Sequence, residues 1–417
     1  MPDGVEDAPL RLLGAVALAL LFEEYDQAMV TAALKQIAAE LGMAERELGL
    51  YLAMIRIGAL PAFALIPLAD RIGRRPVFVF ATAAMGVLTF ATAFSQSPLQ
   101  FVVLQALTRT FFVAGSAVAF VIVTEEFPAA HRGWGIGMLA ALGAVGHGLG
   151  AAAFSQIDRL PYGWRALYAF GIVPVLMIPW FLRRIPETKR FEREAAAVAA
   201  AAAPGHVTRP LGLGDMIAPL RALATTHPAR AAGVAATGFI AAIATLPSFQ
   251  FSGYYTQTKL GWEPGRYAVL VIVGGGIGII GNIVAGRLGD TWGRKRVGFA
   301  LLSVFPLASF GFYQGPVWGV IVAWVVMVFT MMGGRVILRS LATELFPTSQ
   351  RGAASGMFAV LETLGAVTGL LAIWAYRADD VTELALAVPL VSLVIWAAAL
   401  VLMRFPETRQ RELEEIA

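Results

Sequence analysis

The sequence of 417 residues contains no cysteine and only four histidines, and charged residues make up no more than 14% of it. Without cysteine the chain can form no disulfide, no zinc–thiolate site and no thiol nucleophile. Nothing in it resembles a nucleotide-binding loop, so ATP is not expected to drive its activity, and enzymatic chemistry has little support. We expect neither a cofactor nor a bound metal ion.

Apolar side chains, by contrast, are abundant and make up 58% of the sequence. A water-soluble chain of this composition would expose more apolar surface than globular proteins tolerate, so we expect a membrane protein surrounded by lipid. The net charge of +4 could indicate a nucleic-acid partner. The cations, however, gather in short connections between apolar runs, which is the pattern that orients membrane helices. We therefore exclude nucleic acid as a partner.

Twelve apolar runs of roughly 20 residues are each long enough to cross a bilayer as a helix. They cover residues 12–32, 49–69, 77–95, 99–123, 134–155, 166–183, 231–256, 267–287, 297–314, 317–342, 353–375 and 384–403. The sequence therefore predicts an all-α membrane protein with twelve transmembrane helices in two six-helix bundles related by pseudo-two-fold symmetry.

The longest connection lies between the sixth and seventh runs and holds an alanine-rich stretch followed by Pro204-Gly205. Such a segment is typical of a linker between halves. We expect an N-terminal bundle at 1–190, a cytoplasmic linker at 191–229, a C-terminal bundle at 230–404 and a cytoplasmic tail at 405–417. Because the cations fall in connections of one parity, both termini should be cytoplasmic. We expect a multi-pass protein of the cell membrane, in a bacterium the inner membrane.

Three motifs occur twice, one copy in each predicted bundle and at nearly the same offset. The pairs are Ala69-Asp-Arg-Ile-Gly-Arg-Arg75 with Gly286-Arg-Leu-Gly-Asp-Thr-Trp-Gly-Arg-Lys295, Thr124-Glu-Glu-Phe-Pro128 with Thr343-Glu-Leu-Phe-Pro347, and Pro186-Glu-Thr188 with Pro406-Glu-Thr408. Chance does not place three different motifs in one register. The two halves are therefore predicted to be duplicates.

The two copies of the first motif resemble the signature loops of the major facilitator superfamily, and the resemblance extends over the whole chain. The Pro-Glu-Thr motifs and the ending from Pro406 to Ile416 are similar to those of the sugar-porter and organic-ion-carrier branch. This resemblance implies a secondary transporter working by alternating access, in which two bundles rock about a site near the bilayer midplane. We expect it to act as a monomer on a small-molecule substrate and protons.

The repeated loops combine a glycine turn, a carboxylate near a helix end and cations that can pair with acids of a neighbouring helix. Such pairs would close the cytoplasmic side, and breaking them would open it. The alternative is that these charges only set membrane topology. The predicted cytoplasmic gate consists of Asp70, Arg71, Gly73, Arg74, Arg75, Glu125, Arg132, Asp290, Gly293, Arg294, Lys295, Arg339, Glu344 and Arg351.

Charged residues inside the predicted spans mark functional sites, because ionised groups are costly in hydrocarbon unless they face a cavity or a partner. Asp26, Arg56, Arg109 and His147 lie on four helices at one depth, about 21–24 Å from the cytoplasmic ends at 1.5 Å per residue. Glu23 and Glu24 lie slightly lower, and the spacing puts Glu23 on the face of Asp26.

Tyr25-Asp26 and Arg109 resemble the proton-coupling carboxylate and its arginine in proton-linked sugar porters. Opening of the pair or arrival of substrate could let the carboxylate take up a proton on one side and release it on the other. We assign Asp26, Arg109, Glu23 and Glu24 to proton coupling. The alternative is a permanent structural ion pair.

A second buried arginine, Arg56, suits an anionic group of the solute, although it could instead only neutralise Glu23 or Glu24. His147 could be a wall residue or a proton relay. In the second half, Arg335 and Glu362 could pair at the floor of the cavity. Together with Gln250 and Tyr254 of the seventh span, these residues form the predicted substrate-binding set: Arg56, His147, Gln250, Tyr254, Arg335 and Glu362.

The predicted lining is poor in the neutral donors and acceptors that a sugar site requires. The fifth span lacks the glutamine of sugar porters, and the seventh has only Gln250. We therefore predict proton-coupled symport of a small organic anion or carboxylate metabolite. Symport of a sugar or polyol and proton-driven export of a metabolite or drug remain as alternatives. A receptor or scaffold without transport would not be expected to keep the layer of charges.

Overall fold

The computed structural model describes residues 7–128, 131–193, 196, 213–347 and 350–409. All regular structure in these residues is helical. Within them, ten helical segments have the length and apolar composition to span a bilayer. A bent pair, Trp164–Leu176 with Ile178–Arg184, gives an eleventh, and the helix Asp7–Ala32 corresponds to the first predicted run. The predicted all-α architecture is therefore confirmed.

Contacts divide the chain into two compact units, one formed by residues 1–37 and 58–210 and the other by residues 38–57 and 211–417. The chain thus enters the second unit briefly before returning to the first. Most of the predicted linker 191–229 lies outside the described residues, and so does half of the predicted tail 405–417. The division into bundles at those boundaries stays a prediction.

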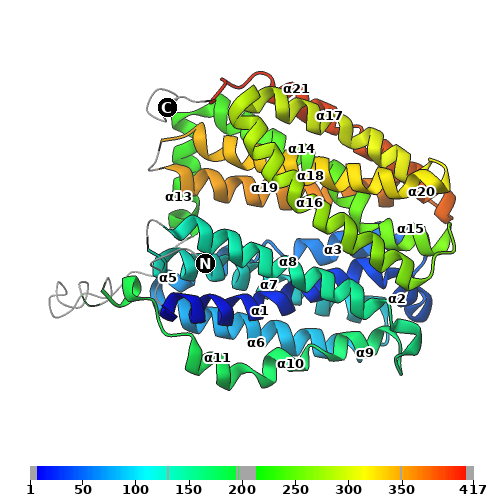
Figure 1. Ribbon diagram of the computed structural model, residues 1–417, viewed down its shortest axis with the longest axis horizontal. Coiled ribbons are helices and arrows are strands. Elements are labelled where there is room, and N and C mark those ends of the chain that lie inside the picture. Colours follow the sequence, from blue (N-terminus) through cyan, green and yellow to red (C-terminus); the bar gives the residue numbers. More distant parts are fainter. Residues whose placement is uncertain (1–6, 129–130, 194–195, 197–212, 348–349, 410–417) are drawn as a thin grey trace. The chain divides into compact units, whose positions relative to one another are not determined.

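The first unit is built on four long helices that run side by side in Figure 1. Its helices are α1 (Asp7–Ala32), α4 (Ala62–Leu65), α5 (Ala69–Ile72), α6 (Arg74–Thr92), α7 (Pro98–Glu126), α8 (Arg132–Phe154), α9 (Trp164–Ala169), α10 (Ile172–Leu176) and α11 (Ile178–Arg184), with α2 (Leu34–Leu41) at the passage to the second unit. α1 packs along α8, and α6 packs along α7. Leu20, Phe78, Ile122 and Leu139 belong to the apolar core between them.

The second unit repeats this arrangement. Its helices are α3 (Leu48–Ile57), α13 (Leu213–Thr226), α14 (Pro228–Gln250), α15 (Ser252–Thr258), α16 (Pro264–Trp292), α17 (Arg294–Tyr313), α18 (Val320–Glu344), α19 (Arg351–Tyr376), α20 (Val381–Ser392) and α21 (Ile395–Leu402). α14 packs along α19, and α18 packs against both α16 and α17. The short helix α3, which comes from the second span, also lies on α19.

Glycine allows the closest helix contact in each unit. A Cβ atom at Gly146 of α8 would overlap the carbonyl of Leu21 in α1, and one at Gly365 of α19 would overlap that of Phe239 in α14. Small residues let membrane helices approach until their backbones touch, which gains van der Waals contact that the hydrophobic effect does not supply in lipid. The two glycines occupy corresponding places in the duplicated halves.

Several spans are interrupted, and proline accounts for the breaks. Pro61 precedes α4, Pro174 lies in α10 before the 41° bend of the sixth span, and Pro247 precedes the end of α14. Proline lacks the N–H that an α-helix needs for its i to i−4 hydrogen bond, so the helix bends or restarts. The breaks give short helices where the sequence predicted continuous runs.

Candidate functional site

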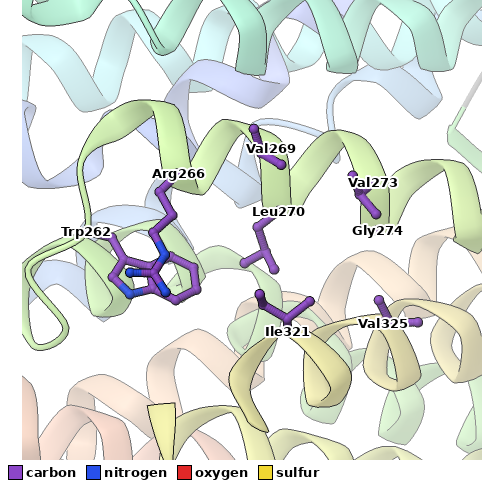
Figure 2. Close-up of a pocket in the computed structure, with 8 residues that line it drawn as sticks. All are labelled: Trp262, Arg266, Val269, Leu270, Val273, Gly274, Ile321 and Val325. Carbon is purple, nitrogen blue, oxygen red and sulfur yellow. The ribbon is translucent and has the colours of Figure 1, made fainter. Parts of the chain in front are cut away.

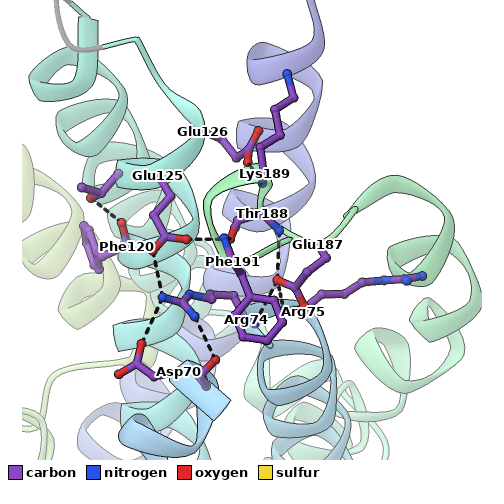
Figure 3. A network of polar contacts seen from close by, with 12 residues as sticks. Asp70, Arg74, Arg75, Phe120, Glu125, Glu126, Glu187, Thr188, Lys189 and Phe191 are labelled. Atoms are coloured by element: carbon purple, nitrogen blue, oxygen red, sulfur yellow. Dashed lines mark hydrogen bonds and ion pairs between the residues drawn. The ribbon is translucent and has the colours of Figure 1, made fainter. Parts of the chain in front are cut away.

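The loop before α6 is closed by a glutamate from the end of the sixth span. Gly73 has φ 108°, a conformation that favours glycine, and its turn exposes the first amides of α6. The carboxylate of Glu187 accepts hydrogen bonds from the backbone N–H of Arg74 at 3.0 Å and of Arg75 at 3.3 Å (Figure 3). A carboxylate at a helix N-terminus satisfies unpaired amides and complements the helix dipole.

Arg74 lies buried at the centre of the same cluster, with 6% of its side chain exposed. Its guanidinium pairs with Glu125 of α7 at 3.0 Å and with Asp70 at 3.1 Å. The hydroxyl of Thr188 donates to the other oxygen of Glu125 at 2.6 Å (Figure 3). A buried guanidinium with two carboxylate partners holds α5, α6 and α7 together by charge-assisted hydrogen bonds.

The second unit contains the same construction. Gly293 has φ 102°, and the carboxylate of Glu407 accepts from the backbone N–H of Arg294 at 2.9 Å and of Lys295 at 3.3 Å. The guanidinium of Arg294 pairs with Asp290 at 3.3 Å and also with Glu344 of α18. The repeat of three motifs therefore corresponds to a repeat of one charge cluster, each copy within its own unit.

Sequence reasoning missed the roles of Glu187, Thr188 and Glu407. The Pro-Glu-Thr motifs were used as signs of duplication and of family resemblance, and no contact was predicted for them. Their constant distance from the glycine turns was the available signal: the acid follows the loop by the same interval in both halves. That a carboxylate would cap the helix after each turn became visible only once the chain was folded.

The remaining predicted gate residues have varied contacts. Arg75 donates from its side chain to the carbonyl of Leu182, and Arg351 donates to the carbonyl of Phe346 at 3.4 Å. Arg132 is exposed at the start of α8. Asp70 pairs with Arg74 of its own loop. The structure places Arg71 at the end of α5, beside the glycine turn.

Asp26 is fully buried in α1 and lies among polar groups of two other helices. The hydroxyl of Thr89 in α6 donates to its Oδ1 at 2.9 Å, and Gln105 and Arg109 of α7 also interact with the carboxylate. In the described part of the chain, Oδ2 has no hydrogen-bond partner. The guanidinium of Arg109 lies over the ring of Phe112, 4.8 Å from its centroid. The structure thus brings the predicted coupling pair into electrostatic contact within one unit.

Glu23 lies one turn before Asp26 and is also fully buried. Ser116 of α7 donates to its Oε2 at 2.8 Å, and its Oε1 has no hydrogen-bond partner among the described residues. Gly115 leaves the space that this oxygen occupies, because a Cβ there would come within 2.6 Å of it. Glu24, the third predicted acid, is half-buried. The contacts made by Thr89, Gln105 and Ser116 were not predicted.

The residues predicted to bind substrate are divided between the units. His147 lies half-buried on α8 in the first unit, and Arg56 lies half-buried on α3 in the second. Gln250 is buried at the end of α14. The hydroxyl of Tyr254 in α15 donates to Glu45 at 2.6 Å, a contact within the second unit that ties the start of the second span to the seventh.

Arg335 and Glu362 form an ion pair, as the sequence had suggested, with 2.8 Å between Nε and Oε1. Arg339 joins them with 3.3 Å between its terminal nitrogen and Oε2. Arg339 was assigned to the cytoplasmic gate, but its recorded partner is Glu362 rather than a residue of the loop cluster. The structure groups it with two predicted substrate-binding residues.

A pocket of about 240 Å³ lies between α16 and α18. Leu270, Ile321 and Val325 line its apolar part, and Arg266 stacks on Trp262 at one end with its guanidinium 4.2 Å from the ring centroid (Figure 2). None of the predicted site residues lines it. We assign it no part in the candidate site.

The family model of the Major Facilitator Superfamily matches this chain over residues 16–370 and 251–415. Over 98% of the chain and 95% of the relative's length, it is 25% identical to the gallate transporter of Pseudomonas putida. It is 28% identical to myo-inositol transporter 3C of Cryptococcus neoformans var. grubii over 43% of the chain and 31% of that protein. The chain belongs to the Major Facilitator Superfamily and is a transporter, not an enzyme.

Solved structures support the same fold. The inward open xylose transporter XylE from E. coli superposes with a TM-score of 0.74 at 17% identity, covering 98% of this chain and 99% of that one. Together with the helices described above, this confirms the predicted fold of twelve transmembrane helices in two bundles. The protein is a multi-pass membrane protein.

Proposed function

We propose that this protein is a secondary active transporter that couples movement of a small organic anion to movement of protons. The observation that carries the proposal is the fully buried carboxylate of Asp26, held by Thr89 and in electrostatic contact with Arg109. A buried carboxylate that has one satisfied and one free oxygen can hold a proton on the free oxygen. Proton exchange at such a group requires a change in its surroundings, which alternating access supplies.

The charges of the second unit support an anionic solute. Arg335 and Arg339 outnumber their partner Glu362, and Arg56 of α3 belongs to the same unit. A carboxylate would match these guanidinium groups by forked hydrogen bonds. The relative that aligns over nearly the full length is named for gallate, which is a carboxylate, and this favours the same class here.

Uptake of a sugar or polyol is the second candidate. It is favoured by the likeness of the fold to a xylose transporter and by the shorter match to a myo-inositol transporter. Against it stands the scarcity of neutral amide side chains in the predicted lining, because each hydroxyl of a sugar must exchange its bonds to water for bonds to protein. Outward transport is a matter of gradients and uses the same residues.

The transport cycle proposed here moves residues 1–190 against residues 230–404, with both termini in the cytoplasm and the protein in the cell membrane as a monomer. In this scheme the clusters around Arg74 and Arg294 close the cytoplasmic side, and Arg132 and Arg351 contribute to the same gate. Disrupting a cluster would shift the protein toward the state that is open to the cytoplasm.

Reconstituted vesicles test the proposal. Purified protein in proteoliposomes with an imposed pH gradient should accumulate gallate or benzoate, and Asp26→Asn should abolish accumulation while retaining exchange of labelled for unlabelled substrate. Asp158→Asn, the same change at an exposed position of η4 (Ile157–Arg159), is the control and should behave as the unaltered protein.

Two outcomes would contradict the proposal. If Asp26→Asn still concentrates substrate against its gradient, Asp26 does not couple protons. If xylose or myo-inositol accumulates while both acids are inert, the substrate is a sugar or polyol.

A further inference from the structure

Two arginines and one glutamate form a charge cluster inside the second unit that carries a net positive charge. Arg335 and Arg339 lie one turn apart on α18, and Glu362 lies near the middle of α19. The carboxylate of Glu362 spans the two guanidinium groups, with 2.8 Å to Arg335 and 3.3 Å to Arg339. Within the described residues, Glu362 is the only acid recorded against either arginine.

The arginines are only partly covered although they belong to a membrane span. Arg335 is 46% exposed and Arg339 56%, whereas Glu362 is 24% exposed. Charged side chains within membrane spans face a protein interior or a water-filled cavity, because hydrocarbon does not solvate them. The exposed parts of the two guanidinium groups therefore point to a water-accessible path, where a dissolved anion can reach them.

The hydrogen-bonding capacity of the cluster is unevenly filled. A guanidinium has five N–H donors, and Arg335 uses its Nε for Glu362. No acceptor is recorded for its two terminal nitrogens in the described part of the chain. Those donors are arranged as a fork that fits the two oxygens of a carboxylate. A neutral amide or alcohol would leave the excess positive charge without a counterion.

We propose that Arg335 and Arg339 bind the carboxylate of the transported solute and that Glu362 is an internal anion which the solute displaces. Glu362 holds both guanidinium groups in place while the site is empty, and a solute carboxylate takes over part of its hydrogen bonds. The inference rests on the proposed transport of organic anions and names the residues that select the carboxylate. Arg339 is thereby a binding residue rather than part of the cytoplasmic gate.

Equilibrium binding to the purified full-length protein tests this. Benzoate and its neutral isostere benzamide are titrated by calorimetry against the unaltered protein and against Arg335→Gln, Arg335→Lys and Glu362→Gln. We expect Arg335→Gln to weaken benzoate binding by about tenfold or more, because a hydrogen-bonded charge partner is lost, with no comparable effect on benzamide. Arg335→Lys, which keeps the charge and loses the fork, should fall between.

Glu362→Gln separates an internal competitor from a structural ion pair. Removal of the competing charge should tighten benzoate binding several-fold, whereas a purely structural role predicts weaker binding. The control is Arg266→Gln, which removes an exposed arginine that stacks on Trp262 at the apolar pocket and should leave the affinity unchanged.

The two levels of the argument fail differently. If the unaltered protein binds benzoate and Arg335→Gln binds it within twofold of that affinity, this inference is overturned and anion transport stands. Weaker benzoate binding in Glu362→Gln would also overturn it. If the unaltered protein binds none of benzoate, gallate and nicotinate, the proposed substrate class is wrong and this inference falls with it.

Discussion

At the scale of single residues, the two buried acids of α1 have unlike surroundings. Asp26 has a threonine donor and an arginine in electrostatic contact, whereas Glu23 has one serine donor, and its nearest recorded charged neighbour is the like-charged Glu24. Burying an ionised carboxylate without a cation is costly, so a neutral side chain at position 23 is better suited to this site. The same argument does not apply at position 26.

This difference predicts the effect of Glu23→Gln on stability. The amide oxygen can still accept from Ser116, and no charge has to be buried, so the melting temperature in detergent should be unchanged or higher. Glu23→Ala should lower the free energy of unfolding by about 1–3 kcal/mol, because the hydroxyl of Ser116 loses its buried partner. If Glu23→Gln destabilises the protein as much as Glu23→Ala, a favourable ionic interaction of Glu23 has been missed.

Hydroxyl groups illustrate what could not be predicted for the site. Most threonines and serines in these helices donate to a carbonyl of their own preceding turn, as Thr92 does to Leu88 and Thr108 to Leu104. Thr89 and Ser116 instead donate to carboxylates of α1. The sequence does not distinguish the two behaviours, because the choice depends on which neighbouring helix brings an acceptor within reach.

At the scale of elements, a distant glutamate caps the first turn of α6 and another caps that of α17. In both cases the carboxylate lies more than a hundred residues from the amides that it accepts from. Each cap therefore fixes the end of the last span in its half onto the loop between two earlier spans. The loop motif and the Pro-Glu-Thr motif act as one structural unit.

Removing these caps should destabilise the protein. Glu187→Ala and Glu407→Ala are each expected to lower the free energy of unfolding by about 0.5–2 kcal/mol, the range for helix N-caps. The clusters lie in separate units and share no partner, so the effects should add in the double variant. Glu192→Ala removes an exposed acid just beyond the first motif and serves as the control. Equal melting temperatures for Glu187→Ala and the control would contradict the capping role.

The glycines at the closest helix contacts give a second test at this scale. Gly146→Ala and Gly365→Ala place a methyl group on a backbone carbonyl of the crossing helix, and each should cost about 1–3 kcal/mol of stability. Gly148 of α8 and Gly356 of α19 have nothing near the position of a Cβ. Alanine at either control position should be neutral or stabilising by up to about 1 kcal/mol, because alanine favours helix. Denaturation midpoints of the four variants would decide the matter.

At the scale of the whole molecule, the absence of cysteine makes the predicted orientation directly testable. Single cysteines can be introduced at exposed positions without further change. Asp158→Cys and Asp379→Cys lie in connections of one parity, and Thr291→Cys lies beside the glycine turn in a connection of the other parity. Because the cation-rich connections should be cytoplasmic, a membrane-impermeant maleimide should label the first two in intact cells and the third only after lysis. Labelling of Thr291→Cys from outside would reverse the assignment.

The sequence by itself determined the helices, their duplication and the family. Runs of apolar residues as long as a bilayer is thick have few alternatives to a helix, since backbone groups in lipid must be satisfied within their own segment. The observed ends accordingly lie within a few residues of most predicted ones, as with α8 at Arg132–Phe154 against 134–155. The spacing of Glu23 and Asp26 likewise placed both on one buried face.

Only the tertiary structure decided which of these groups meet. Glu187 lies against α6, Thr89 donates to Asp26, and Arg339 shares Glu362 with Arg335 because separate helices cross at those points. Helix formation is governed by local hydrogen bonding and the lipid surroundings, so the sequence reveals it directly. Contacts between helices depend on the positions of small residues, proline breaks and packing along the full length of each bundle, and no local pattern contains that information.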